Sequence, residues 1–271
     1  MNFAQYLKER RTLIDRALVE LLPPKNDYPL TLHQAIHYSL YGGKRIRPIL
    51  ALAACEAVGG KAKKMLAAAC GIELIHAFSL VHDDLPCIDN DDTRRGRPTV
   101  HKKFGESIAL LAGDALLSLG FELLSQDGTS PHRAEVLREL SHAIGTYGMI
   151  GGQVADLELR GKEPDLPSLE YVHTHKTGAL IAVSLKAGGI LGGGSPKEVG
   201  ELFKFGEYIG FTFQIVDDII DGEGYALIFE PKGAKREAEK LTQKAKSHLK
   251  IFGRKGKPLA ALADFILTRK M

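Results

Sequence analysis

Apolar residues recur with a helical period along almost the whole chain, and the alternation typical of half-buried strands is almost absent. One face of the first predicted helix carries Phe3, Leu7, Ile14, Leu18 and Leu21. Glycine and proline signals separate the stretches expected to be helical, which are 3–21, 31–41, 48–58, 62–82, 106–124, 131–147, 177–190, 196–221 and two segments after 234. No linker or repeat divides them. The sequence predicts an all-α bundle forming a single domain over residues 1–271.

The composition agrees with a chain that buries a sizeable core. Hydrophobic residues make up 44% of 271, and the formal net charge of +3 does not favour a nucleic-acid partner. Three cysteines without a C-x-x-C pair indicate a reduced, cytoplasmic protein. No signal peptide is visible, and the nearest candidate for a membrane span, 178–194, contains Lys186 and many glycines. We therefore expect a soluble, cytoplasmic protein without a membrane span.

Two aspartate clusters stand inside these apolar helical segments. The first contains Asp83, Asp84 and Asp89, and the second contains Asp217, Asp218 and Asp221. Carboxylates packed this tightly repel one another, so each cluster should take up a proton or bind cations. Arginines 94, 95 and 97 follow the first cluster, and acid beside base suggests a divalent metal held together with a phosphate-bearing ligand.

The spacing of each cluster predicts how its carboxylates come together. Gln214 and the three aspartates of the second cluster lie at offsets of three, four and seven, which is one face of a helix. In the first cluster, Asp89 is six residues beyond Asp83, and Pro86 can end the helix and return Asp89 toward Asp83. A calcium loop starting at Asp89 is excluded, because Arg94 occupies the position of the required glycine.

Other motifs are weaker when taken alone. His76 is most simply a core histidine, and the basic residues at 44, 45 and 47 are most simply a surface patch. The preceding Gly42–Gly43 is more suggestive, because a glycine hinge lets backbone amides and cations approach an anion. The run matches neither a P-loop nor a dinucleotide fingerprint. His173 and His175 without further partners are weak evidence for zinc.

Five motifs in order carry a resemblance to a known family. They are residues 42–48 (GGKRIRP), 73–96 (from Glu73 through the first acidic cluster to Gly96), 151–156 (GGQVAD), 176–178 (KTG) and 213–221 (FQIVDDIID). Together they resemble the trans-isoprenyl diphosphate synthases, with bacterial farnesyl diphosphate synthases as the nearest branch. The resemblance implies the isoprenoid synthase helical bundle around a central active-site cavity, a homodimer, and condensation of isopentenyl diphosphate with an allylic diphosphate.

The resemblance also assigns roles by position. The magnesium ligands would be Asp83, Asp84 and Asp89 together with Asp217, Asp218 and Asp221, for roughly three Mg²⁺ per site with Mn²⁺ as a substitute. Isopentenyl diphosphate would be gripped by Gly43, Lys44, Arg47, His76 and Arg95. The allylic substrate and its cation would meet Arg94, Lys176, Thr177 and Gln214, the expected catalytic residues. No side chain is an obvious base, so the proton should leave with the departing diphosphate.

Product length should depend on the helix that precedes Asp83. Phe78 and Ser79 lie five and four residues before it, about one turn down the presumed cavity. A bulky aromatic ring at that depth favours the C15 product, farnesyl diphosphate, over the C20 product, geranylgeranyl diphosphate.

The chain departs from the family pattern after Asp221. The family usually carries a loop of about twenty residues there, with a glycine–lysine segment, and lids of this kind are often mobile without substrate. Here Gly222 leads directly into what reads as the stretch beyond the loop. Either the loop is absent or its residues are missing from the printed sequence, and we favour the second explanation.

Three other functions are less favoured than prenyl transfer. They are a terpene cyclase, a head-to-head synthase and a non-catalytic partner subunit.

Overall fold

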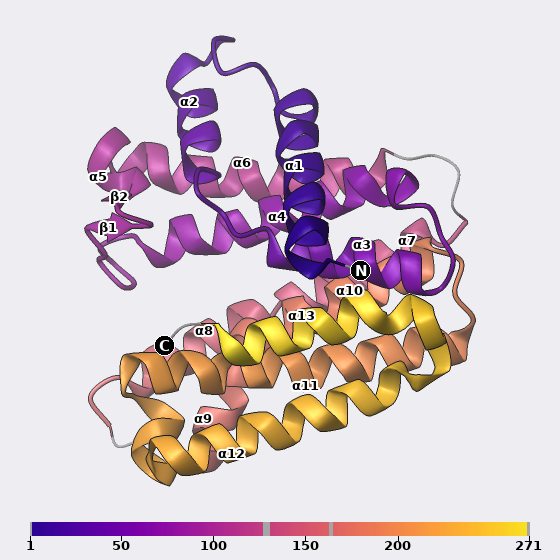
Figure 1. The fold of residues 1–271 in the computed structure, drawn as a ribbon. Helices are drawn as coiled ribbons and strands as arrows, with labels where there is room; N and C mark the ends of the chain where they lie inside the picture. Colours follow the sequence, from indigo (N-terminus) through magenta and orange to yellow (C-terminus); the bar gives the residue numbers. More distant parts are fainter. Residues whose placement is uncertain (1, 127–130, 163–164, 270–271) are drawn as a thin grey trace. The chain divides into compact units, whose positions relative to one another are not determined.

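The fold is described here from a computed structural model, which describes residues 2–126, 131–162 and 165–269. It is built almost entirely of helices, so the predicted all-α class is confirmed (Figure 1). The chain separates into two compact units, one formed by residues 7–49 and 66–129, the other by residues 1–6, 50–65 and 130–271. The single-domain assignment stays a prediction, and each unit is described by itself.

The smaller unit carries the N-terminal helices and the first acidic cluster. Its helices are α1 (Phe3–Leu21), α2 (Leu30–Ser39), most of α4 (Ala62–Asp83), α5 (Val100–Phe104) and α6 (Glu106–Ser125). A two-stranded antiparallel hairpin, β1 (Thr93–Arg94) and β2 (Arg97–Pro98), is the one strand pair in the described residues. Its turn at Arg95 and Gly96 has positive φ at both positions, the geometry of a tight hairpin turn. These two-residue strands were not predicted from the sequence.

The larger unit carries the second acidic cluster. It contains most of α3 (Ile46–Ala57), α7 (Arg133–Ile144), α8 (Met149–Leu159), α9 (Leu166–Val172), the π-helix η1 (His173–Gly178) and α10 (Ala179–Leu191). It continues with α11 (Pro196–Asp221), α12 (Gly224–His248), the 3₁₀ segment η2 (Leu249–Gly256) and α13 (Lys257–Thr268). Helices α11, α12 and α13 lie side by side (Figure 1).

Helix α11 has clear sequence signals at both ends. Ser195 and Glu198 form a capping box at its N-terminus, and Pro196 occupies the first turn. Gly222, in the left-handed conformation with φ 72°, caps its C-terminus. Ile215 and Val216 face the core of this unit together with Tyr225 of α12. Of the acidic positions that follow, Asp221 is exposed, whereas the Asp218 side chain is only 13% exposed.

Two helices meet the length and composition expected of a membrane span. They are α4, with mean hydropathy 1.5 over its window, and α6, with 1.7. These are stronger candidates than the segment 178–194 named from the sequence. In α4, 67% of the window is buried, as in the core helix of a soluble fold, whereas in α6 the buried share is 39%. Helix α6 therefore exposes more of its apolar window to solvent than α4 does.

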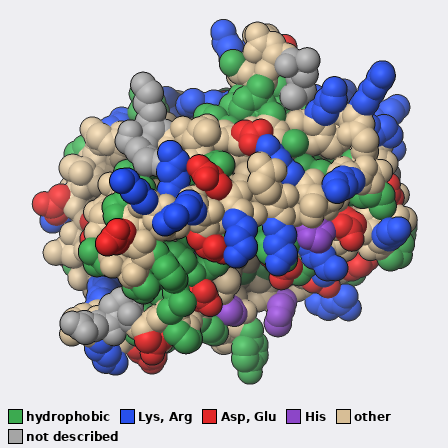
Figure 2. Space-filling view, turned by 60° about the horizontal axis from the view of Figure 1, so that its bottom comes forward, with side chains coloured by type: hydrophobic (Ala, Val, Ile, Leu, Met, Phe, Trp, Pro, Cys, Tyr) green, Lys and Arg blue, Asp and Glu red, His purple; other side chains and the backbone are tan. Residues whose placement is uncertain are grey.

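One face of the molecule carries charged side chains of both signs (Figure 2). Figure 2 shows one face on which Lys and Arg side chains are interspersed with Asp and Glu. This mixture agrees with the low net charge of the chain.

Candidate active site

The first acidic cluster forms where α4 ends. Helix α4 stops at Asp83, three residues before Pro86, and the chain then folds back on itself. The N–H of Asp89 donates to the carbonyl of Asp83 at 2.9 Å, and that of Asn90 to the carbonyl of Leu85 at 3.1 Å. The turn thus brings Asp89 back beside Asp83, as the proline led us to expect.

Asp84 has a different environment from its neighbours. Its side chain is buried, and Arg94 Nε donates to its Oδ1 at 2.6 Å. Burial raises the pKa of Asp84 to about 6, although the guanidinium of Arg94 acts in the opposite direction. A second nitrogen of Arg94 contacts Asp91 at 3.0 Å. Asp84 therefore holds Arg94 in place.

The β1–β2 hairpin presents three arginines beside this cluster. Arg94 pairs with Asp84, Arg95 donates to the carbonyl of Tyr41 at 3.1 Å, and Arg97 lies 4.1 Å from the ring centre of Tyr41. A shallow pocket within this unit is lined by Tyr38, Tyr41, Asp84, Arg94, Arg95 and Arg97, among others. The pocket has the charge to receive an anion.

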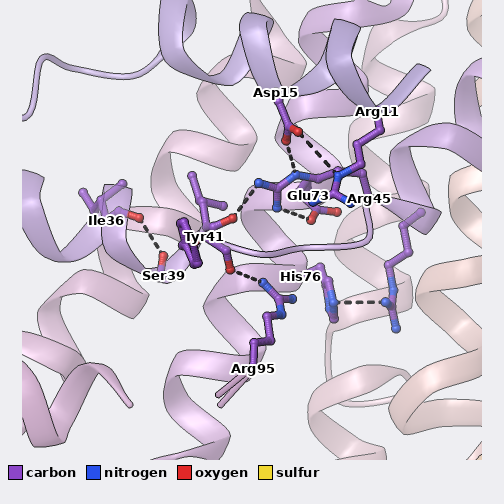
Figure 3. Close-up of polar contacts among 11 residues, drawn as sticks. Arg11, Asp15, Ile36, Ser39, Tyr41, Arg45, Glu73, His76 and Arg95 are labelled. Carbon is purple, nitrogen blue, oxygen red and sulfur yellow. Dashed lines mark hydrogen bonds and ion pairs between the residues drawn. The ribbon is translucent and has the colours of Figure 1, made fainter. Parts of the chain in front are cut away.

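The glycine hinge ends in a buried arginine. Gly42 has φ +72°, and a Cβ on Gly43 would lie 2.1 Å from a guanidinium nitrogen of Arg45, so both positions need glycine. Arg45 is buried and bonds Asp15 and Glu73, each at 2.8 Å (Figure 3). Arg45 is therefore a structural cation that fixes the hinge, whereas Lys44 is exposed.

His76 and Arg47 form a second basic group in the same unit. Arg47 donates to Nε2 of His76 at 3.2 Å (Figure 3). Burial, and next the charges of Arg47 and Arg95, hold the pKa of His76 well below its ordinary value. The imidazole is neutral at pH 7, so the positive charge of this group lies on the two arginines. Of the five predicted grip residues, the structure gathers Gly43, Arg47, His76 and Arg95.

The two residues predicted to determine product length, Phe78 and Ser79, lie on α4 in the turn before Asp83. Phe78 is buried and packs edge-to-face on His82, with ring centres 4.9 Å apart. His82 in turn bonds the carbonyl of Leu110 on α6 at 2.9 Å. The His82 ring fits there because position 113 is glycine. A Cβ at that position would lie 2.0 Å from Nε2 of His82. Ser79 donates to the carbonyl of His76 within the helix.

The second acidic cluster occupies the end of α11 in the larger unit. Asp217 contacts Arg269 at 2.5 Å. Asp218 accepts the N–H of Tyr225 at 2.8 Å and lies 3.4 Å from Nε2 of His173. Asp221 is exposed. The expected shared face thus holds carboxylates with three different environments.

The predicted cation-steadying residues lie in the π-helix η1 and on α11. Lys176 contacts Asp156 of α8 at 2.7 Å, and Thr177 follows it; Gln214 is half-buried on α11. A Cβ on Gly152 would lie 2.2 Å from the backbone nitrogen of Lys176, so glycine permits this close approach of α8. π-helical turns often occur at functional sites.

Sequence reasoning missed three residues at these clusters. Asp156 and Arg269 pair with predicted site residues, and both amide atoms of Gln153 are buried with no partner among the described residues. The motif at 151–156 contained a signal for Gln153 and Asp156. No local pattern marks Arg269, because its partner is 52 residues away along the chain.

Comparison with known proteins decides the family. The model of the polyprenyl synthetase family matches residues 29–233. The chain belongs to this family. It is 44% identical to geranylgeranyl pyrophosphate synthase 4 of Arabidopsis thaliana, over 99% of this chain and 78% of that protein.

Solved structures agree with the family. An FPP/GFPP synthase of Zymomonas mobilis matches with a TM-score of 0.92 at 39% identity, covering 98% of this chain and 99% of that one. A geranyltransferase of Legionella pneumophila matches with a TM-score of 0.88 at 32% identity, covering 99% and 96%. The isoprenoid synthase fold predicted from the motifs is therefore confirmed, and the chain is a trans-prenyltransferase.

One polyprenyl synthetase relative has more residues than this chain over the matched region. The match to the Arabidopsis enzyme runs over 293 alignment positions, more than the 271 residues of this chain, so that relative carries residues that this chain lacks. In the structure, α11 passes to α12 through Gly222 and Glu223 alone. The 271-residue chain thus folds at this point with a two-residue link.

Proposed function

We propose that this prenyltransferase condenses isopentenyl diphosphate with dimethylallyl or geranyl diphosphate and releases farnesyl diphosphate. The observation that carries the proposal is a cluster of basic side chains in the smaller unit. Arg47, Arg95 and a neutral His76 stand together there, and the acidic turn from Asp83 to Asp89 belongs to the same unit. Cations beside carboxylates suit a substrate whose diphosphate is bound partly by side chains and partly through metal ions.

The donor chemistry of both clusters fits magnesium. Carboxylate oxygens suit this hard cation, which commonly binds one or two carboxylates together with substrate phosphates and water. No group of three or more metal-ligating side chains gathers in the described residues. We assign Asp83 and Asp89 in one unit, and Asp217 and Asp221 in the other, as ligands. Bound magnesium would neutralise charge that develops on the departing diphosphate.

Asp84 and Asp218 would then act through their neighbours. Asp84 holds Arg94, whose guanidinium adds positive charge for the diphosphate, and Asp218 fixes the start of α12. Lys176 of η1 is a second cation for the same role, held by Asp156. Preorganised charges of this kind stabilise a transition state without reorganising at the moment of reaction.

The reaction balances without a base from the protein. The bond from C1 to oxygen in the allylic diphosphate breaks, and its electron pair stays on the departing diphosphate. The double bond of isopentenyl diphosphate supplies the electrons for the new carbon–carbon bond at C1. This leaves a tertiary cation at C3 of the isopentenyl unit. A proton then leaves C2 of that unit for the released diphosphate, and a new double bond forms between C2 and C3. Thr177 and the amide of Gln214 would steady the allylic cation through their dipoles, while an apolar surrounding excludes water.

A geranylgeranyl diphosphate synthase is the second candidate. The plant relative at 44% identity carries that name, which favours the longer product. We prefer the C15 product, because Phe78 is a bulky, buried ring fixed by His82 at the position proposed to limit chain length.

An assay with labelled isopentenyl diphosphate tests the proposal. The purified protein is incubated with magnesium and with a C5, C10 or C15 allylic diphosphate, and the products are separated by length. We expect a C15 product that requires the metal and disappears with a chelator. A main C20 product would favour the second candidate. Hydrolysis or cyclisation without condensation, or no turnover at all, would contradict the proposal.

A further inference from the structure

Arg269, just beyond the end of α13, occupies the second acidic cluster. Its Nη2 lies 2.5 Å from Oδ1 of Asp217 and donates to the carbonyl of Phe213 at 2.8 Å. Its guanidinium carbon lies 3.7 Å from the centre of the Phe213 ring. Only 12% of the side chain is exposed. A guanidinium held by a carboxylate, a carbonyl and a ring face is a bound cation rather than a surface charge.

One atom of Arg269 is not satisfied in this position. Its Nε is buried and has no hydrogen-bond partner among the described residues. Leaving a buried donor unpaired is costly, and the cost favours any second position in which the same group reaches water or an acceptor. Arg269 follows the last residue of α13, so its backbone lies outside the helix.

We propose that Arg269 is a built-in counter-ion of the second acidic cluster that magnesium must displace from Asp217. The inference rests on the proposed function, which assigns Asp217 as a metal ligand. Two cations cannot share one carboxylate oxygen at bonding distance without strong repulsion. Metal binding at this oxygen therefore releases the Arg269 guanidinium, and the contacts that hold the segment just beyond α13 to α11 are lost with it.

Metal binding without substrate gives a direct test. Mn²⁺ alone is titrated into the protein, and free Mn²⁺ is measured by electron paramagnetic resonance. Arg269→Gln should bind Mn²⁺ at least about threefold more tightly than the unchanged protein, since the competing ion pair is gone. Arg254→Gln, which removes an exposed charge in η2 at the other end of α13, is the matched control and should change affinity little. Unchanged or weaker binding in Arg269→Gln would overturn the proposal.

A second readout follows the displaced segment. Hydrogen exchange of α13, measured by mass spectrometry, should increase near its C-terminus when Mn²⁺ binds the unchanged protein. In Arg269→Gln the exchange there should already be high and respond little to the metal. Protection that increases with metal in both proteins would contradict displacement.

Asp217→Asn separates this inference from the proposed function. Weaker Mn²⁺ binding in that variant, with no change in Arg269→Gln, would reject only the role of Arg269. Binding that is unaffected in Asp217→Asn would reject Asp217 as a ligand, and the inference with it. Circular dichroism of each variant confirms that it is folded before the titrations are compared.

Discussion

At the scale of single residues, Phe78 connects packing to product length. Its ring is buried against His82, which is seated in the space left by Gly113 on α6. Replacing Phe78 with Ala removes the ring and leaves a cavity one turn before Asp83. We expect the main product to lengthen from C15 to C20 or beyond. Ser79→Ala, one position away, serves as the control and should shift the distribution less. Reversed-phase separation of the dephosphorylated products measures both, and an unchanged distribution in Phe78→Ala would refute the proposed limit.

The three cysteines offer a second prediction at this scale. Burial raises the pKa of Cys55 to about 11 and that of Cys70 to about 12, whereas Cys87 is exposed. The thiolate is the reactive form, and a raised pKa leaves little of it at pH 8. We therefore expect a thiol reagent to modify one cysteine rapidly in the native protein and all three after unfolding. Mass spectrometry of the labelled peptides identifies the site, and rapid native labelling at Cys55 or Cys70 would contradict the packing described here.

At the scale of elements, Asp218 fixes the junction of α11 and α12. Its carboxylate accepts the N–H of Tyr225, and a Cβ on Gly224 would lie 2.3 Å from it. Loss of a helix-capping carboxylate costs about 1–2 kcal/mol. Asp218→Ala should lower the free energy of unfolding by that amount in urea denaturation. Asp221→Ala, which removes an exposed carboxylate at the end of the same helix, should leave stability nearly unchanged. Equal stability of the two variants would argue against a capping role.

The sequence predicted long helices well and their partners poorly. The predicted bounds of 3–21 and 196–221 agree with α1 and α11, because apolar periodicity and terminal proline or glycine act within a few residues. The hairpin at 93–98 and helices α8 and α9 were missed, because strands of two residues, a helix with two adjacent glycines and a helix of seven residues leave little periodic signal. The contacts of Asp217 with Arg269 and of Asp218 with His173 depend on tertiary packing between distant segments. The side-chain types of the candidate site can therefore be read from the sequence, whereas their pairing cannot, and the assignment of each residue to the site stays a prediction.

At the scale of the whole molecule, the outer face of α6 bears on assembly. Leu110 and Leu111 are 48% and 53% exposed, on a helix whose apolar window is only 39% buried. An apolar face of this kind marks an interaction surface, and a second copy of the chain can cover it by symmetric pairing. We expect a homodimer in solution and a monomer after Leu110→Gln and Leu111→Gln are combined.

Light scattering after size-exclusion chromatography measures the mass of each species. Val19→Gln, an exposed apolar position on α1 at 69% exposure, is the control and should remain dimeric. A monomeric unchanged protein, or a dimer that survives both leucine substitutions, would show that α6 is not the interface. If the double variant is monomeric and also loses condensation while circular dichroism shows it folded, assembly is required for catalysis; if it stays active, the dimer contributes stability alone.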